Sequence, residues 1–303
     1  MGDVIALSLP PIVIAMLAGV ACALPGNFLL LSRRAMLGDA MSHVVLPGIV
    51  LAFLVTGSGS GLAMGAGALL AAGASALLIE WITRRARMEP GAAMAVVFTT
   101  MFAGGVLLLE ATGTAGLHFD VEHALYGNLE SLIWLAATGP ESLVDPAALA
   151  RLPEELPRLA LTALGLGAAL WLFRRPLVVT VFDPVFARSQ GIPTGLVMAG
   201  LTGATALAAV AAFQAVGSIL TIAMLICPAA TARLLTRRLG AQIALSLACA
   251  SLAAVVGYVL AGHVPPWLGL GFTLSASGMI ATVAGLMLAG AALAASQGRA
   301  ARL

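Results

Sequence analysis

Residues 7–31 read LSLPPIVIAMLAGVACALPGNFLLL, and none of these 25 residues is charged. A helix rises about 1.5 Å per residue, so this stretch is long enough to cross the roughly 30 Å hydrocarbon core of a bilayer. The first nine residues of the chain lack the basic flank of a cleavable signal peptide, so we expect the stretch to stay in the mature protein. It is therefore predicted to be a membrane-spanning helix.

Apolar stretches of similar length recur along the chain. None of them alternates like a barrel strand, and within lipid a helix satisfies all of its own backbone hydrogen bonds. The 34 glycines, among them Gly61 and Gly65 at small-xxx-small spacing, favour close contact between such helices. We therefore predict an all-α polytopic membrane protein in which residues 1–303 form a single transmembrane domain. Nine spans are expected, with eight as the alternative count, at 7–31, 36–55, 62–82, 92–109, 157–173, 195–213, 217–235, 241–261 and 277–295.

The composition excludes several classes of function. Hydrophobic residues make up 61% of the 303 residues and charged residues only 9%, against about a quarter in soluble domains, which excludes a water-soluble enzyme. The net charge of +2 is too small and too scattered for a nucleic-acid-binding surface. All 15 basic residues are arginine, so the chain lacks the lysine with which a P-loop binds ATP. Cys22, Cys227 and Cys249 are isolated within apolar stretches and predict neither disulfides nor a cysteine zinc site.

Arginine clusters predict which ends of the spans face the cytoplasm. The positive-inside rule places all of them on the cytoplasmic side, and nine spans connect them if the N-terminus is outside and the C-terminus inside. The segment 110–155 then faces outward, and it carries eight acidic residues against the single Arg151. The clusters lie at 33–34, 84–87, 174–175, 188, 233–238 and 299–302.

The start of the second predicted span contains a candidate metal site. Asp39 and His43 lie four residues apart, on one face of a helix with their Cβ atoms about 5–6 Å apart. A carboxylate and an imidazole at this separation can bind one cation. An acidic residue within a span raises the free energy of membrane insertion by roughly 2.5–3.5 kcal/mol. An acidic residue that is present despite this cost therefore indicates a functional site. Pro47 has no N–H and leaves the carbonyl of His43 without its helical donor, which adds a free oxygen beside the pair.

Two other interpretations of this pair stay open. Asp39 lies only five positions after Arg34, so it can instead cap the helix at the interface, with His43 as a packed polar residue. Aspartate and histidine also relay protons in proton-driven carriers. Spacing alone does not distinguish a proton relay from a metal site.

A second informative stretch, residues 182–193, reads FDPVFARSQGIP. Asp183 is a favourable N-cap, Pro184 suits the first helical position, and Gly191 suits a left-handed C-terminal stop. These signals predict a cytoplasmic helix of about two turns, which is too short to span. Because it carries both apolar and polar side chains, it is either a knob for a cytoplasmic partner or an ordinary interfacial loop helix.

Five segments of the chain resemble bacterial ABC-type zinc/manganese uptake permeases, and they are spread in order over two thirds of its length. The resemblance is poor at 130–156 and at 262–277. The matching segments read LLLSRRAMLGDAMSHVVLPGIVLAFL at 29–54, VVFTTMFAGGVLLL at 96–109, DVEHALYGN at 120–128, FDPVFARSQGIP at 182–193 and AFQAVGSILTIAMLICPAATARLLT at 212–236.

The resemblance implies a multi-pass permease of the cobalamin-importer type (type II) in a bacterial inner membrane. It implies a homodimer that works with two cytoplasmic ATPase subunits and an extracytoplasmic metal-binding protein, with no nucleic-acid partner and no permanently bound cofactor. Asp39 and His43 fall on the family's Asp-x-x-x-His metal-path motif. Residues 183–191 fall on the helix that family members insert into the ATPase. The residues assigned to this coupling are Phe182, Asp183, Pro184, Ala187, Arg188 and Gly191.

Zinc is the expected cargo, because the aspartate–histidine pair of each subunit, doubled by two-fold symmetry, fills a four-coordinate shell. Manganese or iron is the alternative, since the same ligand types serve them and the free carbonyl of His43 is a further donor. A proton-coupled secondary metal carrier is the rival from another class. An intramembrane metalloprotease is weaker, because the chain contains no His-Glu-x-x-His. His118 and His123, with Asp120 and Glu122, form either an outer metal-handling cluster or an ordinary solvated loop.

Overall fold

The apolar stretches of the chain fold into helices. The computed structural model describes residues 6–57, 61–111, 129–137, 139–143, 145–267, 269 and 274–300. Every regular element within these ranges is an α-helix or a short 3-10 helix, which confirms an all-helical fold for the described chain. In chain order the elements are α2 Leu9–Leu31, α3 Met36–Thr56, α4 Gly61–Arg85, α5 Pro90–Ala111, η2 Leu129–Ser131, η3 Pro140–Leu143, α7 Pro146–Leu149, α8 Glu155–Leu172, α9 Arg174–Phe182, α10 Pro184–Ser189, α11 Thr194–Leu235, α12 Leu239–Trp267 and α13 Ala276–Ala300.

Most predicted spans correspond to one helix each. This holds for α2, α3, α4, α5, α8, α12 and α13. Within the described ranges, seven helices are long and apolar enough to cross a membrane, and α3 contributes the shorter apolar segment Pro47–Thr56. These helices agree with the predicted multi-pass membrane protein. The predicted number of nine spans stays a prediction.

The predicted spans 195–213 and 217–235 lie in a single element. With 42 residues at about 1.5 Å each, α11 is roughly twice as long as the hydrocarbon core is thick. It breaks at Gly217, whose φ of 79° and ψ of 174° are not helical. Glycine adopts a positive φ without steric cost, so the chain changes direction at one residue. We call the parts before and after Gly217 the first and second arms of α11.

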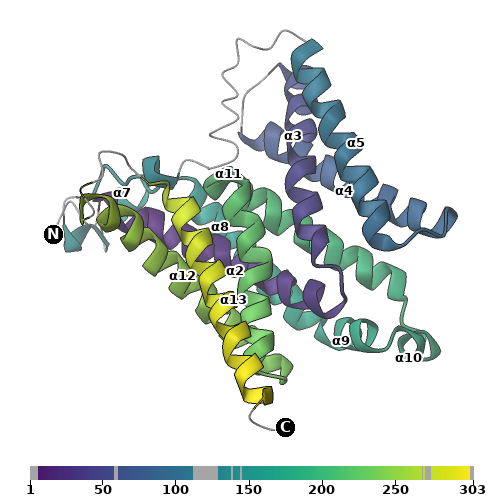
Figure 1. Ribbon diagram of the computed structural model, residues 1–303. Coiled ribbons are helices and arrows are strands. Elements are labelled where there is room, and N and C mark those ends of the chain that lie inside the picture. The colour runs from purple at the N-terminus through teal and green to yellow at the C-terminus, as the bar shows by residue number, and fades with distance from the viewer. Residues whose placement is uncertain are drawn as a thin grey trace.

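The helix α11 is the centre of the bundle. It contacts α2, α3, α4, α8, α12 and α13. Helices α3, α4 and α5 pack against one another, and α3 and α4 join the remaining helices through α11. Figure 1 shows these three helices together at the upper right, beside the other elements. The segment that carries the predicted metal ligands therefore belongs to this group and meets the rest of the bundle at α11.

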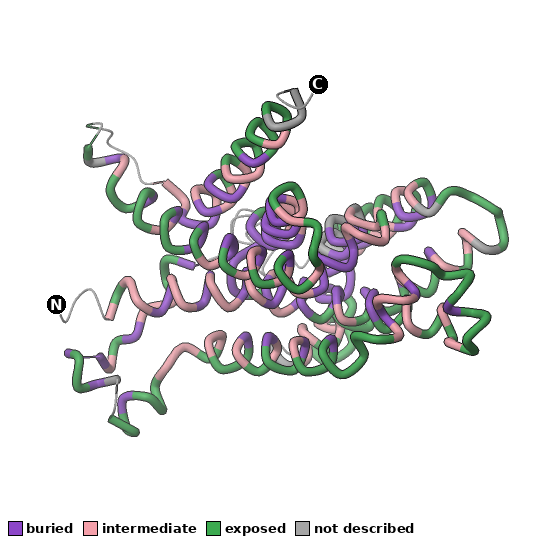
Figure 2. The backbone as a smooth tube through the Cα atoms, turned by 90° about the horizontal axis from the view of Figure 1, so that it is seen from below, coloured by how far each residue is buried: buried purple, intermediate pink, exposed green. Residues whose placement is uncertain are grey.

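Small side chains form much of the buried core. Buried residues follow the centre of the bundle, whereas the connecting segments at its ends are largely exposed (Figure 2). Because lipid tails are as apolar as a protein core, small residues that let backbones approach closely contribute much of the attraction between membrane helices. Fully buried alanines include Ala208, Ala209 and Ala212 of α11 and Ala250, Ala253 and Ala254 of α12.

A buried polar network connects α2 to α12. The Nδ2 of Asn27 donates to Ser246 Oγ at 2.7 Å, and the Nε2 of Gln242 donates to Asn27 Oδ1 at 3.1 Å. All three side chains are fully buried. Interhelical hydrogen bonds contribute about 0.6 kcal/mol each on average in a membrane protein. This network was not predicted from the sequence, although an amide within the first apolar stretch was a signal for it.

The two ends of the bundle differ as the charge pattern predicts. At one end, the backbone N–H of Trp134 donates to the carbonyl of Ala6, and Glu130 Oε1 accepts from the N–H of Ala276 at 2.6 Å. The described part of the acidic segment therefore packs on the starts of α2 and α13. In Figure 1, α7 lies near the start of α2, at the far side of the molecule from α9 and α10. This separation agrees with an outward N-terminus.

Candidate functional site

The two predicted metal ligands lie on α3. The helical backbone includes positions 39 and 43, so Asp39 and His43 are one turn apart, as their spacing predicts. Their side chains lie outside the described part of the structure, and metal binding by them stays a prediction. The predicted outer cluster at 118–123 also lies outside the described residues. In the ranges that are described, no group of three or more histidine, cysteine or acidic residues is placed to hold a metal ion.

A close contact with α11 holds the start of this segment. A Cβ built at Gly38 would lie 2.8 Å from Cδ1 of Leu225, closer than real Cβ atoms come to other groups. Gly26 of α2 lies against the carbonyl group of the same leucine, where a Cβ would clash. Leu225 belongs to the second arm of α11. It therefore lies between α2 and α3, beside the position that immediately precedes Asp39.

Contacts with α4 and α5 hold the other end of the segment, one turn beyond position 43. A Cβ built at Gly48 would lie 2.5 Å from the carbonyl oxygen of Gly67, so α3 and α4 touch through their backbones. A Cβ built at Gly105 of α5 would lie 2.8 Å from the Cβ of Pro47. Positions 39 and 43 thus lie between a contact with α11 and contacts with α4 and α5.

The predicted start and stop signals of the short cytoplasmic helix are confirmed. The helix α10 begins with Pro184, and the N–H groups of Val185 and Phe186 donate to Asp183 Oδ1 at 3.1 and 2.8 Å. Gly191 has a φ of 74°, the left-handed conformation expected of a helix stop. The helix has six residues between its caps, slightly fewer than the predicted two turns.

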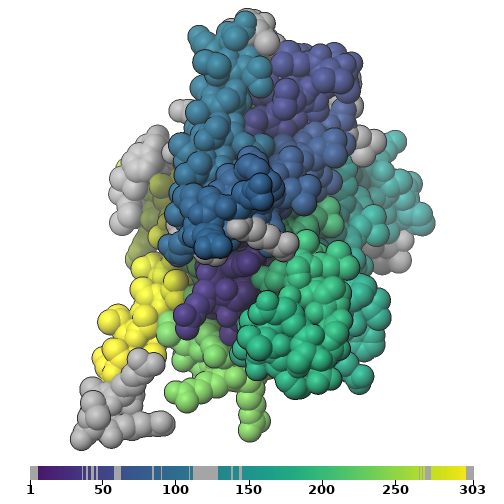
Figure 3. Space-filling model, turned by 90° about the vertical axis from the view of Figure 1, so that its right-hand side faces the viewer, coloured from purple at the N-terminus to yellow at the C-terminus, as the bar shows by residue number. Residues whose placement is uncertain are grey.

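The helices α9 and α10 together form a lobe, which we call the coupling lobe after the ATPase-coupling role predicted for α10. The helix α9 was not predicted from the sequence. Figure 3 shows the lobe in green below α4 and α5. Val185 is 69% exposed and Phe186 is 51% exposed, so the lobe presents apolar side chains on its surface, as docking surfaces do. Ala187 is fully buried and fixes α10 to its neighbours. The other residues assigned to coupling are exposed: Phe182, Asp183, Pro184, Arg188 and Gly191.

A polar cavity lies between the coupling lobe and the α3–α4 pair. Its volume is about 300 Å³, and its walls include Arg34, Glu80, Pro184 and Arg188. The Nη1 of Arg34 lies 4.0 Å from Oε2 of Glu80, an ion pair between the segment that precedes α3 and the end of α4. This ion pair was not predicted from the sequence. The segment that leads into α3 and the coupling lobe therefore line one cavity.

Comparisons with known proteins agree with these features. The chain matches the model of the ABC 3 transport family over residues 6–133 and 147–295. It is 39% identical to the manganese transport system membrane protein MntD of Bacillus subtilis over 277 residues, which cover 91% of this chain and 88% of MntD. It is 33% identical to the zinc transport system membrane protein TroD of Treponema pallidum over 278 residues, which cover 92% of this chain and 71% of TroD.

The fold is also similar to a solved structure. PsaBC from Streptococcus pneumoniae, in complex with Fab, matches with a TM-score of 0.70 at 26% sequence identity. The match covers 93% of this chain and 89% of that one. The chain therefore belongs to the ABC 3 transport family and is the multi-pass membrane permease of a metal-importing ABC transporter in a bacterial inner membrane.

Proposed function

We propose that this permease carries zinc into the cytoplasm along a path that includes Asp39 and His43 of α3. The observation that supports this is the bracing of their segment by three other helices, through Leu225 of α11, Gly67 of α4 and Gly105 of α5. A metal site needs ligands whose positions relative to one another are held fixed by the surrounding structure. Close contacts at both ends of the segment provide such support.

The choice of zinc rests on the number of ligands. Two copies of the chain about a two-fold axis supply two carboxylates and two imidazoles, and four nitrogen and oxygen ligands suit tetrahedral zinc. We therefore propose that the permease works as a homodimer. Manganese prefers about six ligands and is the alternative cargo, because the carbonyl of His43 adds an oxygen; iron is the further alternative. The similarity to MntD, which is named for manganese, and to TroD, which is named for zinc, is compatible with either of these two metals.

Energy is proposed to come from a separate ATPase subunit that binds the coupling lobe. The chain contains no lysine and so has no P-loop of its own. The exposed Val185 and Phe186 offer an apolar contact surface, and Arg188 adds a positive charge beside it. An extracytoplasmic binding protein is proposed to deliver the metal at the opposite, acidic end of the bundle.

Uptake of radiolabelled zinc into sealed vesicles tests the proposal. The vesicles contain the permease and its ATPase subunit, with the matching binding protein on the extracytoplasmic side. We expect ATP-dependent uptake that falls at least about 100-fold in Asp39→Ala and in His43→Ala, because each change removes a ligand from a site with few. Leu51→Ala, an exposed position on the same helix, is the control and should keep normal uptake.

Three outcomes would overturn parts of the proposal. Normal uptake in both alanine variants would remove Asp39 and His43 from the metal path. Uptake by the permease alone under a proton gradient would favour the secondary carrier. Transport of radiolabelled manganese that equimolar zinc does not reduce would reject zinc as the cargo.

A further inference from the structure

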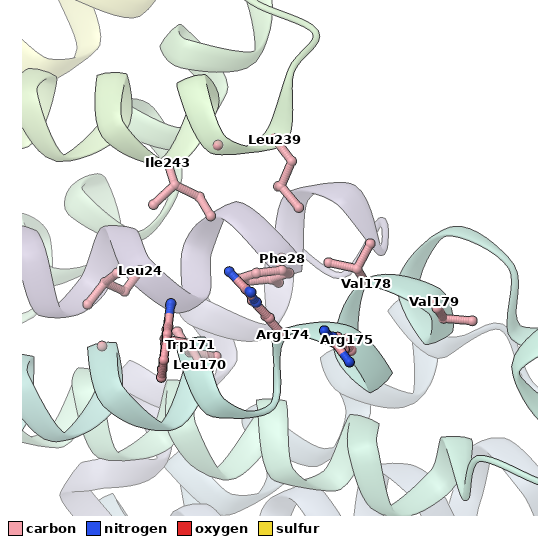
Figure 4. A pocket seen from close by; sticks show the side chains of 12 residues that line it. Leu24, Phe28, Leu170, Trp171, Arg174, Arg175, Val178, Val179, Leu239 and Ile243 are labelled. Atoms are coloured by element: carbon pink, nitrogen blue, oxygen red, sulfur yellow. The ribbon is translucent and has the colours of Figure 1, made fainter.

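A groove opens between the helices α2, α8, α9 and α12, away from the contacts of α3. Its volume is about 830 Å³. Apolar side chains form most of its walls, among them Leu24, Phe28, Leu170 and Ile243 (Figure 4). Of the described residues that line it, none is acidic. The metal path does not account for a groove of this size and character, and α10, which carries the predicted coupling residues Pro184, Ala187 and Arg188, does not line it.

The groove lies at the cytoplasmic ends of its helices. Phe28 is in the last turn of α2, Trp171 is in the last turn of α8, and Leu239 is the first residue of α12. Each of these helix ends adjoins one of the arginine clusters that the positive-inside rule places in the cytoplasm. The deeper wall includes Gly167, which lies five residues, or about 7 Å, inside the end of α8. The groove therefore runs from the cytoplasmic interface toward the middle of the bilayer.

Two arginines stand at the mouth of the groove. The guanidinium of Arg174 lies 5.5 Å from the ring centroid of Trp171, a cation–π contact, and Figure 4 shows it reaching between Trp171 and Phe28. Arg175 lines the groove beside it. Within the part of the chain that is described, no ion pair joins either guanidinium to a carboxylate. The groove thus combines an apolar interior with two positive charges at the depth of the lipid headgroups.

We propose that this groove binds an anionic phospholipid of the cytoplasmic leaflet. The phosphate lies at Arg174 and Arg175, and one acyl chain lies along Leu24, Leu170 and Ile243. The cytoplasmic leaflet is rich in anionic lipids, and basic pockets between membrane helices on this side bind their headgroups. The bound acyl chain fills the space between α2, α8 and α12. This proposal does not depend on which metal the permease carries.

Native mass spectrometry of the full-length permease tests the electrostatic part. The protein is extracted from bilayers of equal phosphatidylglycerol and phosphatidylcholine, and the retained lipid is identified by mass. We expect wild type to retain phosphatidylglycerol, and Arg174→Gln/Arg175→Gln to retain roughly tenfold to thirtyfold less, since two cations are lost. Arg237→Gln/Arg238→Gln removes another exposed cytoplasmic pair outside the groove and should retain as much as wild type. Equal loss in both double variants would overturn the proposal.

A steric variant tests the apolar part. A Cβ built at Gly240 meets open space, so Gly240→Leu enters the groove without displacing its walls. We expect this variant to lose the retained phosphatidylglycerol, whereas Gly285→Leu on α13, which also meets open space, should keep it. Unchanged retention in Gly240→Leu would overturn the proposal. Dissociation of a dimer by this variant would also overturn it, because a second copy of the chain would then occupy the groove.

Tryptophan fluorescence gives a readout that does not depend on retention during extraction. Phosphatidylglycerol with a brominated acyl chain should quench the fluorescence of the reconstituted permease more than brominated phosphatidylcholine does. Trp171→Phe keeps an aromatic ring beside Arg174 and should abolish this difference between the two lipids. A difference that survives in Trp171→Phe would place the bound lipid elsewhere and refute the assignment.

Discussion

The predicted coupling helix α10 and the segment of α3 that carries the predicted metal ligands are held in place in opposite ways. The ends of α10 are determined locally, by Asp183 at its start and Gly191 just beyond its end. The segment of α3 instead depends on Gly67, Gly105 and Leu225, which come from three other helices. The exposed helix thus carries its own end signals, whereas the segment inside the bundle takes its position from residues that are distant in the sequence.

The largest effect is expected where α3 and α4 touch. Gly48→Ala places a methyl group 2.5 Å from the Gly67 carbonyl oxygen, so the helices must separate. Overpacking of this kind costs about 1–3 kcal/mol, more than the roughly 1 kcal/mol that alanine gains over glycine in a helix. We expect a lower unfolding temperature of the detergent-solubilised permease and reduced zinc uptake.

The matched control for this change is Gly73→Ala on α4. A Cβ at Gly73 meets open space, so only the gain in helix propensity applies, and the unfolding temperature should stay the same or rise. Equal unfolding temperatures for the two variants would show that the backbone contact of α3 with α4 does not brace the ligand segment.

The next effect concerns the local signals of α10. In the double change Asp183→Ala/Gly191→Ala, the first substitution removes the N-cap and the second puts a side chain in the left-handed conformation. Each destabilises the helix by about 1 kcal/mol, which is enough to fray a helix of six residues. ATP hydrolysis by the full transporter should continue while the zinc moved per ATP falls sharply, and the unfolding temperature of the bundle should hardly change.

Gly200→Ala is the control for the coupling change. It lies on the first arm of α11, where a Cβ meets open space, and it should leave the ratio of zinc to ATP as in wild type. If the double variant also transports normally, α10 is not the element that couples the ATPase to the metal path.

A smaller effect is expected from a second contact between distant residues. Asn27→Leu leaves Gln242 and Ser246 without their partner on α2, at about 1 kcal/mol, since interhelical hydrogen bonds in membrane proteins are weak. Thr282→Val on α13 removes a hydroxyl that bonds only within its own helix and should be close to neutral. If both variants have the same unfolding temperature, close backbone packing rather than polar contacts holds the bundle together.

The features that sequence predicts correctly are the local ones. The caps of α10 depend on Asp183, Pro184 and Gly191, whose preferences operate within one or two turns, and the apolar stretches show where most helices begin and end. The boundary between the two spans that meet at Gly217 was located correctly, but the geometry of the break eluded prediction, because hydropathy does not show that a single residue joins the two helices. The pairing of Gly48 with Gly67 eluded it too, since each of 34 glycines offers the same freedom and only the packed bundle selects the partners.

The smallest predicted effect tests whether the two regions are independent. The ion pair of Arg34 with Glu80 joins the segment that leads into α3 to the end of α4, and both residues line the cavity that the coupling lobe also lines. Both side chains are partly exposed, so Arg34→Gln should lower stability by about 0.2–1 kcal/mol, and the difference should vanish in high salt. Arg85→Gln, an exposed change at the end of α4, is the control for the loss of one cytoplasmic charge. The contrary outcome is a larger loss of stability that persists in high salt, together with fewer zinc ions moved per ATP. It would mean that α10 is not positioned by its own end signals alone, and that this ion pair connects the coupling lobe to the segment with the predicted ligands.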